Sequence, residues 1–260
     1  MKLAAMEGLN EGGNGVGLTV IGFLAEDPSL PSTRMKTTRY GIAIPKLLSF
    51  MSYRDPDAYV PGIQNILDGY TSYEGITYPS IEQRMANGNK AIEALTSYKQ
   101  AIQEQNQEKA DSSLQILKEN YGDIGYGYLE SPYDAIPPVP LVFYSFRIMV
   151  GLGMLFVALF ILSWWYAKKR KFEKFRFIPY LAIACIPLAY IASQCGWIVA
   201  EVGRQPWIVQ NLMPVNVAIT RIASGWVVTT FWMFAILFTV LLIAEIGIMV
   251  AQIKKGPKMG

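Results

Sequence analysis

The sequence of 260 residues contains no histidine. This absence removes the commonest metal ligand of proteins and excludes nucleophile arrangements that pair histidine with serine or cysteine. Cysteine is scarce as well, with only Cys185 and Cys195 present. At 1.5 Å per residue the two thiols would lie about 15 Å apart along one predicted helix, too far for a disulfide between them. We therefore expect both cysteines to be packing residues.

Charged residues are almost absent from three long stretches after Pro137. These stretches run from Val139 to Tyr166, from Ile178 to Ala200 and from Gly225 to Val250. Each has the roughly 20 residues that are needed to cross the hydrocarbon core of a bilayer. We therefore expect three transmembrane helices.

Basic residues set the predicted orientation of these helices. They gather between the first two stretches and after the third: Lys168, Lys169, Arg170, Lys171, Lys174, Arg176, Lys254, Lys255 and Lys258. By the positive-inside rule both groups are cytoplasmic. They account for most of the net charge of +3, so the charge does not indicate nucleic acid as a partner.

The predicted fold class is an all-α membrane protein, in which three C-terminal transmembrane helices follow an extracytoplasmic, mostly helical loop domain. The expected segments are an extracytoplasmic segment 1–137, transmembrane helices 138–166, 178–201 and 225–250, cytoplasmic segments 167–177 and 251–260, and an outer loop 202–224. No apolar signal region follows Lys2, so nothing would carry the outer segment across a membrane. We expect transmembrane helices upstream, with Met1 either an internal methionine or the start of the second half of a split gene.

The beginning of the outer segment offers few structural signals. Residues 1–30 are rich in glycine and predicted to be loop-like, without the strand and helix that a dinucleotide-binding fingerprint requires. A short apolar helix is expected from Ile44 to Met51.

A polar helical hairpin is predicted further along the outer segment. Ser80 is a predicted helix N-cap, with Gln83 at the capping-box position. A second helical segment, Ser113 to Asn120, is expected to fold back on the first. We expect residues 80–120 to form a surface hairpin without chemistry.

The most informative segment follows the second apolar stretch and reads Glu201-Val202-Gly203-Arg204-Gln205-Pro206-Trp207. Ionisable groups beside a membrane span need a partner and mark function. On residue types alone, a helix cap with an interfacial tryptophan anchor would explain the segment as well. The residue order decides between the two. Gly-Arg-Gln-Pro-Trp after Gly196-Trp197-Ile198-Val199-Ala200-Glu201 resembles the signature of subunit I of the cytochrome bd family of quinol oxidases.

Two other segments carry the same resemblance. In the first apolar stretch Arg147 lies two residues before Met149, and Gly151 and Gly153 would let a bulky planar group or another helix approach the backbone. On residue types alone, Arg147 would be a snorkelling anchor. The start of the chain, Lys2-Leu3-Ala4-Ala5-Met6-Glu7, is similar to a Lys-Leu-Ala-Ala-x-Glu sequence in the family's extracytoplasmic Q loop.

The resemblance implies haem-binding roles. Met149 would be an axial ligand of a low-spin haem b, and Arg147 would stabilise the reduced form of that haem. Glu201 would be the axial ligand of a high-spin haem b, beside haem d or a haem b in its place. Arg204 would neutralise haem propionates, and Trp197 would pack on a haem edge.

The resemblance also implies a quinol site and a set of partners. Lys2 and Glu7 would contribute to the binding and oxidation of quinol. The chain is identified as the C-terminal half of subunit I, a multi-pass protein of the bacterial cytoplasmic membrane with residues 1–137 on the outer face. Its expected partners are the N-terminal half of subunit I, subunit II, membrane lipid, quinol and oxygen.

The alternative from another class is a non-enzymatic, membrane-anchored extracytoplasmic binding module, which would hold no haem. Glu245, a charged residue in the third stretch, receives no role under either interpretation.

Overall fold

The computed structural model describes residues 1–26, 36–169, 177–220 and 222–256. It divides into two compact units, Met1–Ala218 and Ile219–Gly260, which are treated separately below. Several of the basic residues that set the predicted orientation lie outside the described residues: Arg170, Lys171, Lys174, Arg176 and Lys258.

Among the described residues, three helices are long and apolar enough to cross a membrane, which confirms the predicted helices. In the first unit these are α6 (Val139–Lys168) and α7 (Phe177–Glu201). The second unit contains α8 (Ser224–Lys255), which buries none of its described side chains. A helix that is hydrophobic on every face is typical of a membrane span.

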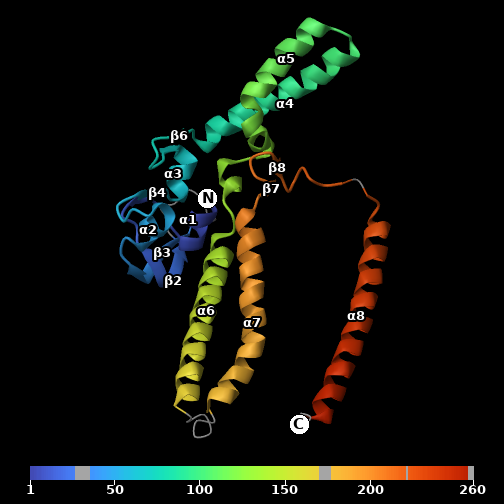
Figure 1. The fold of residues 1–260 in the computed structure, drawn as a ribbon. Helices are drawn as coiled ribbons and strands as arrows, with labels where there is room; N and C mark the ends of the chain where they lie inside the picture. Colours follow the sequence, from blue (N-terminus) through green and yellow to red (C-terminus); the bar gives the residue numbers. More distant parts are fainter. Residues whose placement is uncertain (27–35, 170–176, 221, 257–260) are drawn as a thin grey trace. The chain divides into compact units, whose positions relative to one another are not determined.

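Helices α6 and α7 lie side by side in the first unit (Figure 1). Leu159 of α6 and Cys185 of α7 are buried against each other, with Phe156 and Leu181 packed around them. Cys185 and Cys195 are both free thiols and both buried. The two cysteines therefore pack as expected.

Short helices and strands make up the rest of the first unit. The helices are α1 (Lys2–Glu7), α2 (Leu47–Tyr53), α3 (Ile63–Asp68), α4 (Ile81–Gln103), α5 (Gln107–Asn120) and the 3₁₀ helices η1 (Tyr121–Tyr128), η2 (Pro132–Ala135) and η4 (Val202–Arg204). The strands form antiparallel pairs, which are β1 (Gly13–Asn14) with β4 (Tyr59–Val60), β2 (Leu18–Glu26) with β3 (Lys36–Ile44), β5 (Tyr70–Thr71) with β6 (Thr77–Tyr78), and β7 (Trp207–Val209) with β8 (Met213–Pro214).

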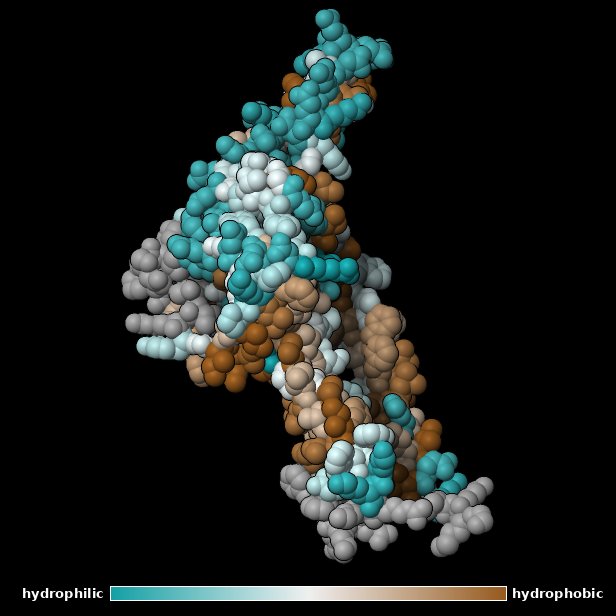
Figure 2. Space-filling view, turned by 60° about the vertical axis from the view of Figure 1, so that its left-hand side comes forward, coloured by the Kyte–Doolittle hydropathy of each residue, from teal (hydrophilic) through white to brown (hydrophobic). Residues whose placement is uncertain are grey.

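The predicted helical hairpin is formed by α4 and α5 (Figure 1). Ser80 caps α4 as expected, since its Oγ accepts a hydrogen bond from the Gln83 backbone N at 3.2 Å and its own N donates to Gln83 Oε1 at 3.3 Å. Asn106 caps α5, so this helix starts before the predicted Ser113. Hydrophilic residues cover the hairpin, at the top of Figure 2, whereas hydrophobic residues dominate the surface of the long helices.

The start of the chain is more regular than its composition predicts. Residues 1–30 were expected to be loop-like, yet they contain α1 and the long strand β2. The partner of β2 is β3, which ends at Ile44, so the predicted helix starts three residues later, at Leu47. Both elements depend on partners distant in sequence, because a six-residue helix and an isolated strand are unstable alone in water.

The main hydrophobic core of the first unit lies where the elements that precede α6 meet the beginning of that helix. It is formed by Ala4, Ala5, Ile63, Leu67, Ile81, Tyr126, Leu129, Ala135, Ile136, Val139, Val142 and Trp207. The core therefore joins α1, α4, η1 and the segment after α7. This arrangement positions the candidate site residues.

Candidate functional site

Helix α1 carries Lys2 and Glu7 and is held by its small residues. Ala4 and Ala5 are fully or almost fully buried, and α1 packs against α6 and η4. Gly8 ends the helix in the left-handed conformation, with φ of 60°, which glycine adopts without steric cost. The Lys-Leu-Ala-Ala-x-Glu sequence is thus a small helix that lies between α6 and the end of α7.

Glu7 forms a buried ion pair with Arg147 of α6. The distance from Glu7 Oε2 to Arg147 Nη2 is 3.3 Å, and the two side chains are 3 % and 11 % exposed. Arg147 also donates hydrogen bonds to the carbonyl oxygens of Met6 and Thr19, while the Thr19 backbone N donates to Glu7 Oε2 at 3.2 Å. The guanidinium lies 3.5 Å from the centre of the Phe143 ring. Arg147 is therefore fixed by protein groups rather than extended toward the membrane surface.

Burial raises the pKa of Glu7 above its ordinary value, while the positive charge of Arg147 and the Thr19 N–H act in the opposite direction. The cost of desolvating the carboxylate outweighs these favourable contacts. Glu7 therefore holds a proton more readily than an exposed glutamate does. This property suits a carboxylate that accepts a proton from a substrate.

Lys2 contacts a different helix from Glu7. Its Nζ donates a hydrogen bond to the Ala200 carbonyl oxygen at 3.4 Å, in the last turn of α7. A Cβ atom added to Gly203 would lie 3.2 Å from Lys2 Cε, so the lysine stem packs against this glycine. Lys2 thus lies beside the backbone between Glu201 and Arg204.

Met149 faces α7 at another glycine. A Cβ atom added to Gly196 would lie 3.2 Å from Met149 Sδ, which is tight. Gly196 precedes Trp197, so the thioether approaches the helix turn that carries this tryptophan. Around Gly151 and Gly153, an added Cβ would meet no described atom within 4 Å.

The remaining predicted site residues are exposed at the end of α7. Glu201 is the last residue of the helix, Arg204 ends η4, and Trp197 is 62 % exposed. Among the described residues, neither Glu201 nor Arg204 makes an ion pair, and no three His, Cys, Asp or Glu side chains gather as a metal site.

Trp207, which ends the Gly-Arg-Gln-Pro-Trp sequence, is not a surface anchor. It is 6 % exposed and belongs to the main core. Its ring centre lies 4.7 Å from that of Tyr126 in η1, with an angle of 57° between the ring planes. The loop after α7 is therefore packed against the segment that precedes α6.

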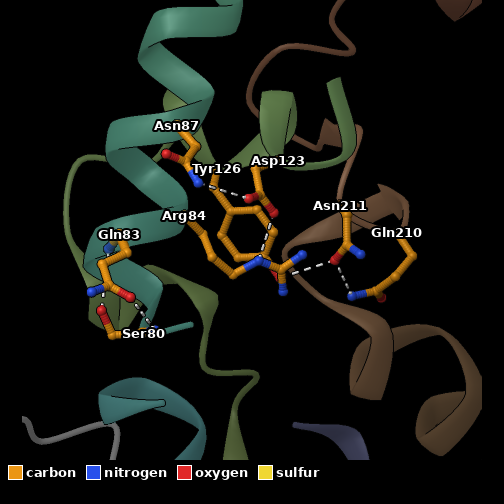
Figure 3. A network of polar contacts seen from close by, with 8 residues as sticks. All are labelled: Ser80, Gln83, Arg84, Asn87, Asp123, Tyr126, Gln210 and Asn211. Carbon is orange, nitrogen blue, oxygen red and sulfur yellow. Dashed lines mark hydrogen bonds and ion pairs between the residues drawn. The ribbon is translucent and has the colours of Figure 1, made fainter. Parts of the chain in front are cut away.

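Polar side chains gather around Tyr126, and sequence reasoning missed their contacts (Figure 3). Arg84 donates from Nε to Asp123 Oδ1 at 2.7 Å and from Nη1 to the Tyr126 hydroxyl at 2.8 Å. The hydroxyl in turn donates to Asn211 Oδ1 at 2.9 Å. The one available signal was an arginine in the first turn of α4. Its partners are distant in sequence and could not be identified from it.

A cavity of about 790 Å³ opens beside the same loop. Its lining includes Val202, Gln205 and Pro206 after α7, and Leu129 and Ile136 before α6. Its volume lies in the range of ligand-binding cavities.

Comparisons with known proteins agree on one family. The family model described as "Cytochrome bd terminal oxidase subunit I" matches residues 1–257. Subunit 1 of the cytochrome bd-II ubiquinol oxidase of Escherichia coli (strain K12) is 30 % identical over 244 residues, which are 87 % of this chain and 44 % of the relative. Subunit 1 of the cytochrome bd ubiquinol oxidase of Bacillus subtilis (strain 168) is 32 % identical over 124 residues, or 47 % of this chain and 26 % of the relative.

A solved structure gives the same result. The bd oxidase from Geobacillus thermodenitrificans is similar with a TM-score of 0.53 and 25 % sequence identity. The match covers 98 % of this chain and 42 % of that chain. The chain thus spans less than half the length of these relatives.

Proposed function

Since the chain belongs to the cytochrome bd terminal oxidase subunit I family and has three helices suited to a membrane, we propose that it supplies the C-terminal half of the haem-bearing subunit of a quinol:oxygen oxidoreductase. The full enzyme would oxidise quinol and reduce oxygen to water. Membership of this family does not favour the alternative of a non-enzymatic binding module.

The ion pair between Glu7 and Arg147 is the observation that carries this proposal. This ion pair connects two elements: α1, for which we propose a role in quinol oxidation, and the turn of α6 that carries Met149. When bound, haem would supply single-electron transfer between quinol and oxygen. Glu7 would accept a quinol proton, and its raised pKa favours that role. Lys2 would hold the quinol anion from the end of α7.

The described residues fit the proposed haem roles. Arg147 Nε is buried and has no hydrogen-bond partner among the described residues. A buried N–H of this kind needs an acceptor, and a haem propionate carboxylate would be a suitable one. The thioether of Met149 would hold the iron of a low-spin haem b, and the carboxylate of Glu201 would hold the iron of a high-spin haem b. Beside the latter, haem d or a further haem b would bind oxygen.

Arg204 and Trp197 would complete the high-spin site. Both are exposed at the end of α7, where a haem lying against that helix could reach them. Arg204 would balance propionate charge, and the indole of Trp197 would pack on the haem edge. The further ligands would come from the N-terminal half of subunit I.

The location and partners follow from the same family. We propose a multi-pass protein of the bacterial cytoplasmic membrane, with residues 1–137 and the loop 202–224 on the outer face. Subunit II, lipid and the N-terminal half would cover the apolar surfaces of α6 and α7. We expect no nucleic acid among the partners.

Glu7→Gln in the complete oxidase tests the quinol role. We expect slower oxygen consumption with quinol, because the amide cannot accept the proton, and unchanged consumption with an artificial electron donor. Lys2→Ala should behave in the same way. Glu11→Gln is the control, since Glu11 is an exposed carboxylate of the same segment. A parallel loss of both activities in Glu7→Gln would mean that the segment is only structural.

A further inference from the structure

A polar network ties the outer helical hairpin to the loop that follows α7 (Figure 3). We call its members, Arg84, Asp123, Tyr126 and Asn211, the hairpin–loop network. Tyr126 lies in η1 and Asn211 lies between β7 and β8. Their side chains are joined by a hydrogen bond of 2.9 Å, and the Gly125 backbone N donates to the Asn211 carbonyl oxygen at the same distance.

Arg84 fixes Tyr126 to helix α4. Its guanidinium pairs with Asp123 at 2.7 Å, donates to the Tyr126 hydroxyl and lies 4.1 Å from the centre of the Tyr126 ring. The side chains of Arg84 and Asp123 are 20 % and 19 % exposed. Burial also raises the pKa of Tyr126, so its hydroxyl stays protonated and donates to Asn211. Hydrogen bonds in such a chain polarise and strengthen one another.

The backbones of α4, η1 and the loop after α7 approach one another too closely to admit an added Cβ atom at Gly125 or Gly88. A Cβ atom added to Gly125 would lie 2.4 Å from the Asn211 carbonyl oxygen, and one added to Gly88 would lie 2.3 Å from Gly127 N. Both distances are shorter than any real Cβ contact. Helix α4, η1 and the loop are therefore closely packed against one another.

The loop is thus held from two sides. Trp207 packs against Tyr126 in the core, and Gly203 packs against the stem of Lys2. Arg204 lies between these two fixed points, and Glu201 lies just before the first. Neither Arg204 nor Glu201 is itself held by an ion pair among the described residues. Their position therefore depends on how the loop is fixed.

We propose that the hairpin–loop network positions Glu201 and Arg204 for the high-spin haem, which makes Arg84, Asp123, Tyr126 and Asn211 positioning residues. The inference rests on the proposed haem ligation by Glu201. It gives the base of the α4–α5 hairpin a role that a solvated surface hairpin would not have.

Two matched pairs of variants in the complete, purified oxidase test this proposal. Tyr126→Phe keeps the ring beside Trp207 but removes the hydroxyl that joins Arg84 to Asn211. Its control is Tyr128→Phe, because the Tyr128 hydroxyl has no hydrogen-bond partner in the part of the chain that the structure describes. Gly125→Ala pushes the loop away from η1. Its control is Gly122→Ala, where an added Cβ meets no described atom within 4 Å.

The readout is the midpoint potential and absorption spectrum of each haem. We expect Tyr126→Phe and Gly125→Ala to shift the potential and spectrum of the high-spin haem, and both controls to match the wild type. The low-spin haem at Met149 should be unchanged in all four, since its ligand lies on another helix. If Gly125→Ala does not assemble, Tyr126→Phe decides alone.

Two results would overturn the proposal. One is a Tyr126→Phe enzyme whose high-spin haem equals that of Tyr128→Phe. The other is an equal shift of both haems, which would indicate a general loss of structure. Either result would leave the proposed function intact, because that function is tested separately by Glu7→Gln and by Glu201→Ala.

Discussion

Arg147 joins the start of α6 to Glu7 and to the segment around it. Its side chain contacts Glu7, the carbonyl oxygens of Met6 and Thr19, and the ring of Phe143. Breaking a buried ion pair by removing one partner costs about 3–5 kcal/mol, because the other charge is left uncompensated. The same residue therefore serves both the packing of α1 and the electrostatics near Met149.

Two replacements of Arg147 test its electrostatic effect on the low-spin haem. Arg147→Ala in the complete subunit should lower the midpoint potential of the low-spin haem without loss of haem, because it removes a cation but no ligand. Arg147→Lys keeps the charge and should restore most of the potential. Redox titration followed by absorption measures both. A potential in Arg147→Ala equal to or above that of the wild type would contradict the role given to this arginine.

At the scale of elements, local signals predicted the structure wherever the stabilising partners are close in sequence. The capping pair Ser80 and Gln83 predicted the start of α4, and the apolar stretches predicted α6, α7 and α8. The strand pair β2 and β3 was missed because its stability comes from pairing between separate segments. Helix α1 was missed because it is short and depends on the burial of Ala4 and Ala5.

At the candidate site as well, the sequence did not predict contacts between segments that are distant along the chain. The sequence identified Glu7 and Arg147 through their motifs but gave no sign that they form an ion pair. Contacts between Lys2 and Ala200, and between Met149 and Gly196, join segments about 50 or more residues apart and depend on how the helices pack. Family motifs therefore supply the candidate residues, and packing decides which of them meet.

The close packing of α4 against η1 predicts that Gly88→Ala destabilises both elements. Gly88→Ala places a Cβ about 2.3 Å from Gly127 N, so the two elements must separate. Overpacking of this kind costs about 1–3 kcal/mol. Hydrogen–deuterium exchange should show faster exchange in α4 and η1 but not in α6. Gly122→Ala is the control, and equal exchange in the two variants would contradict this close packing.

At the scale of the whole molecule, the two proposed haem ligands lie on separate helices, and the chain covers less than half of its relatives. Met149 belongs to α6 and Glu201 ends α7. Large apolar side chains such as Phe160 and Tyr190 remain exposed on these helices. Under the proposed function, another part of the same enzyme would cover these surfaces and complete the haem sites.

Haem-resolved absorption of the purified complete enzyme carrying Glu201→Ala tests this account most directly. A carboxylate beside a membrane is costly without a cationic partner, and in this account ferric haem iron is that partner. We predict loss of the high-spin haem b, together with the haem beside it, while the low-spin haem at Met149 survives. Glu108→Ala, at an exposed carboxylate of α5, should keep all haems. Retention of every haem with normal oxygen reduction in Glu201→Ala would contradict the central claim.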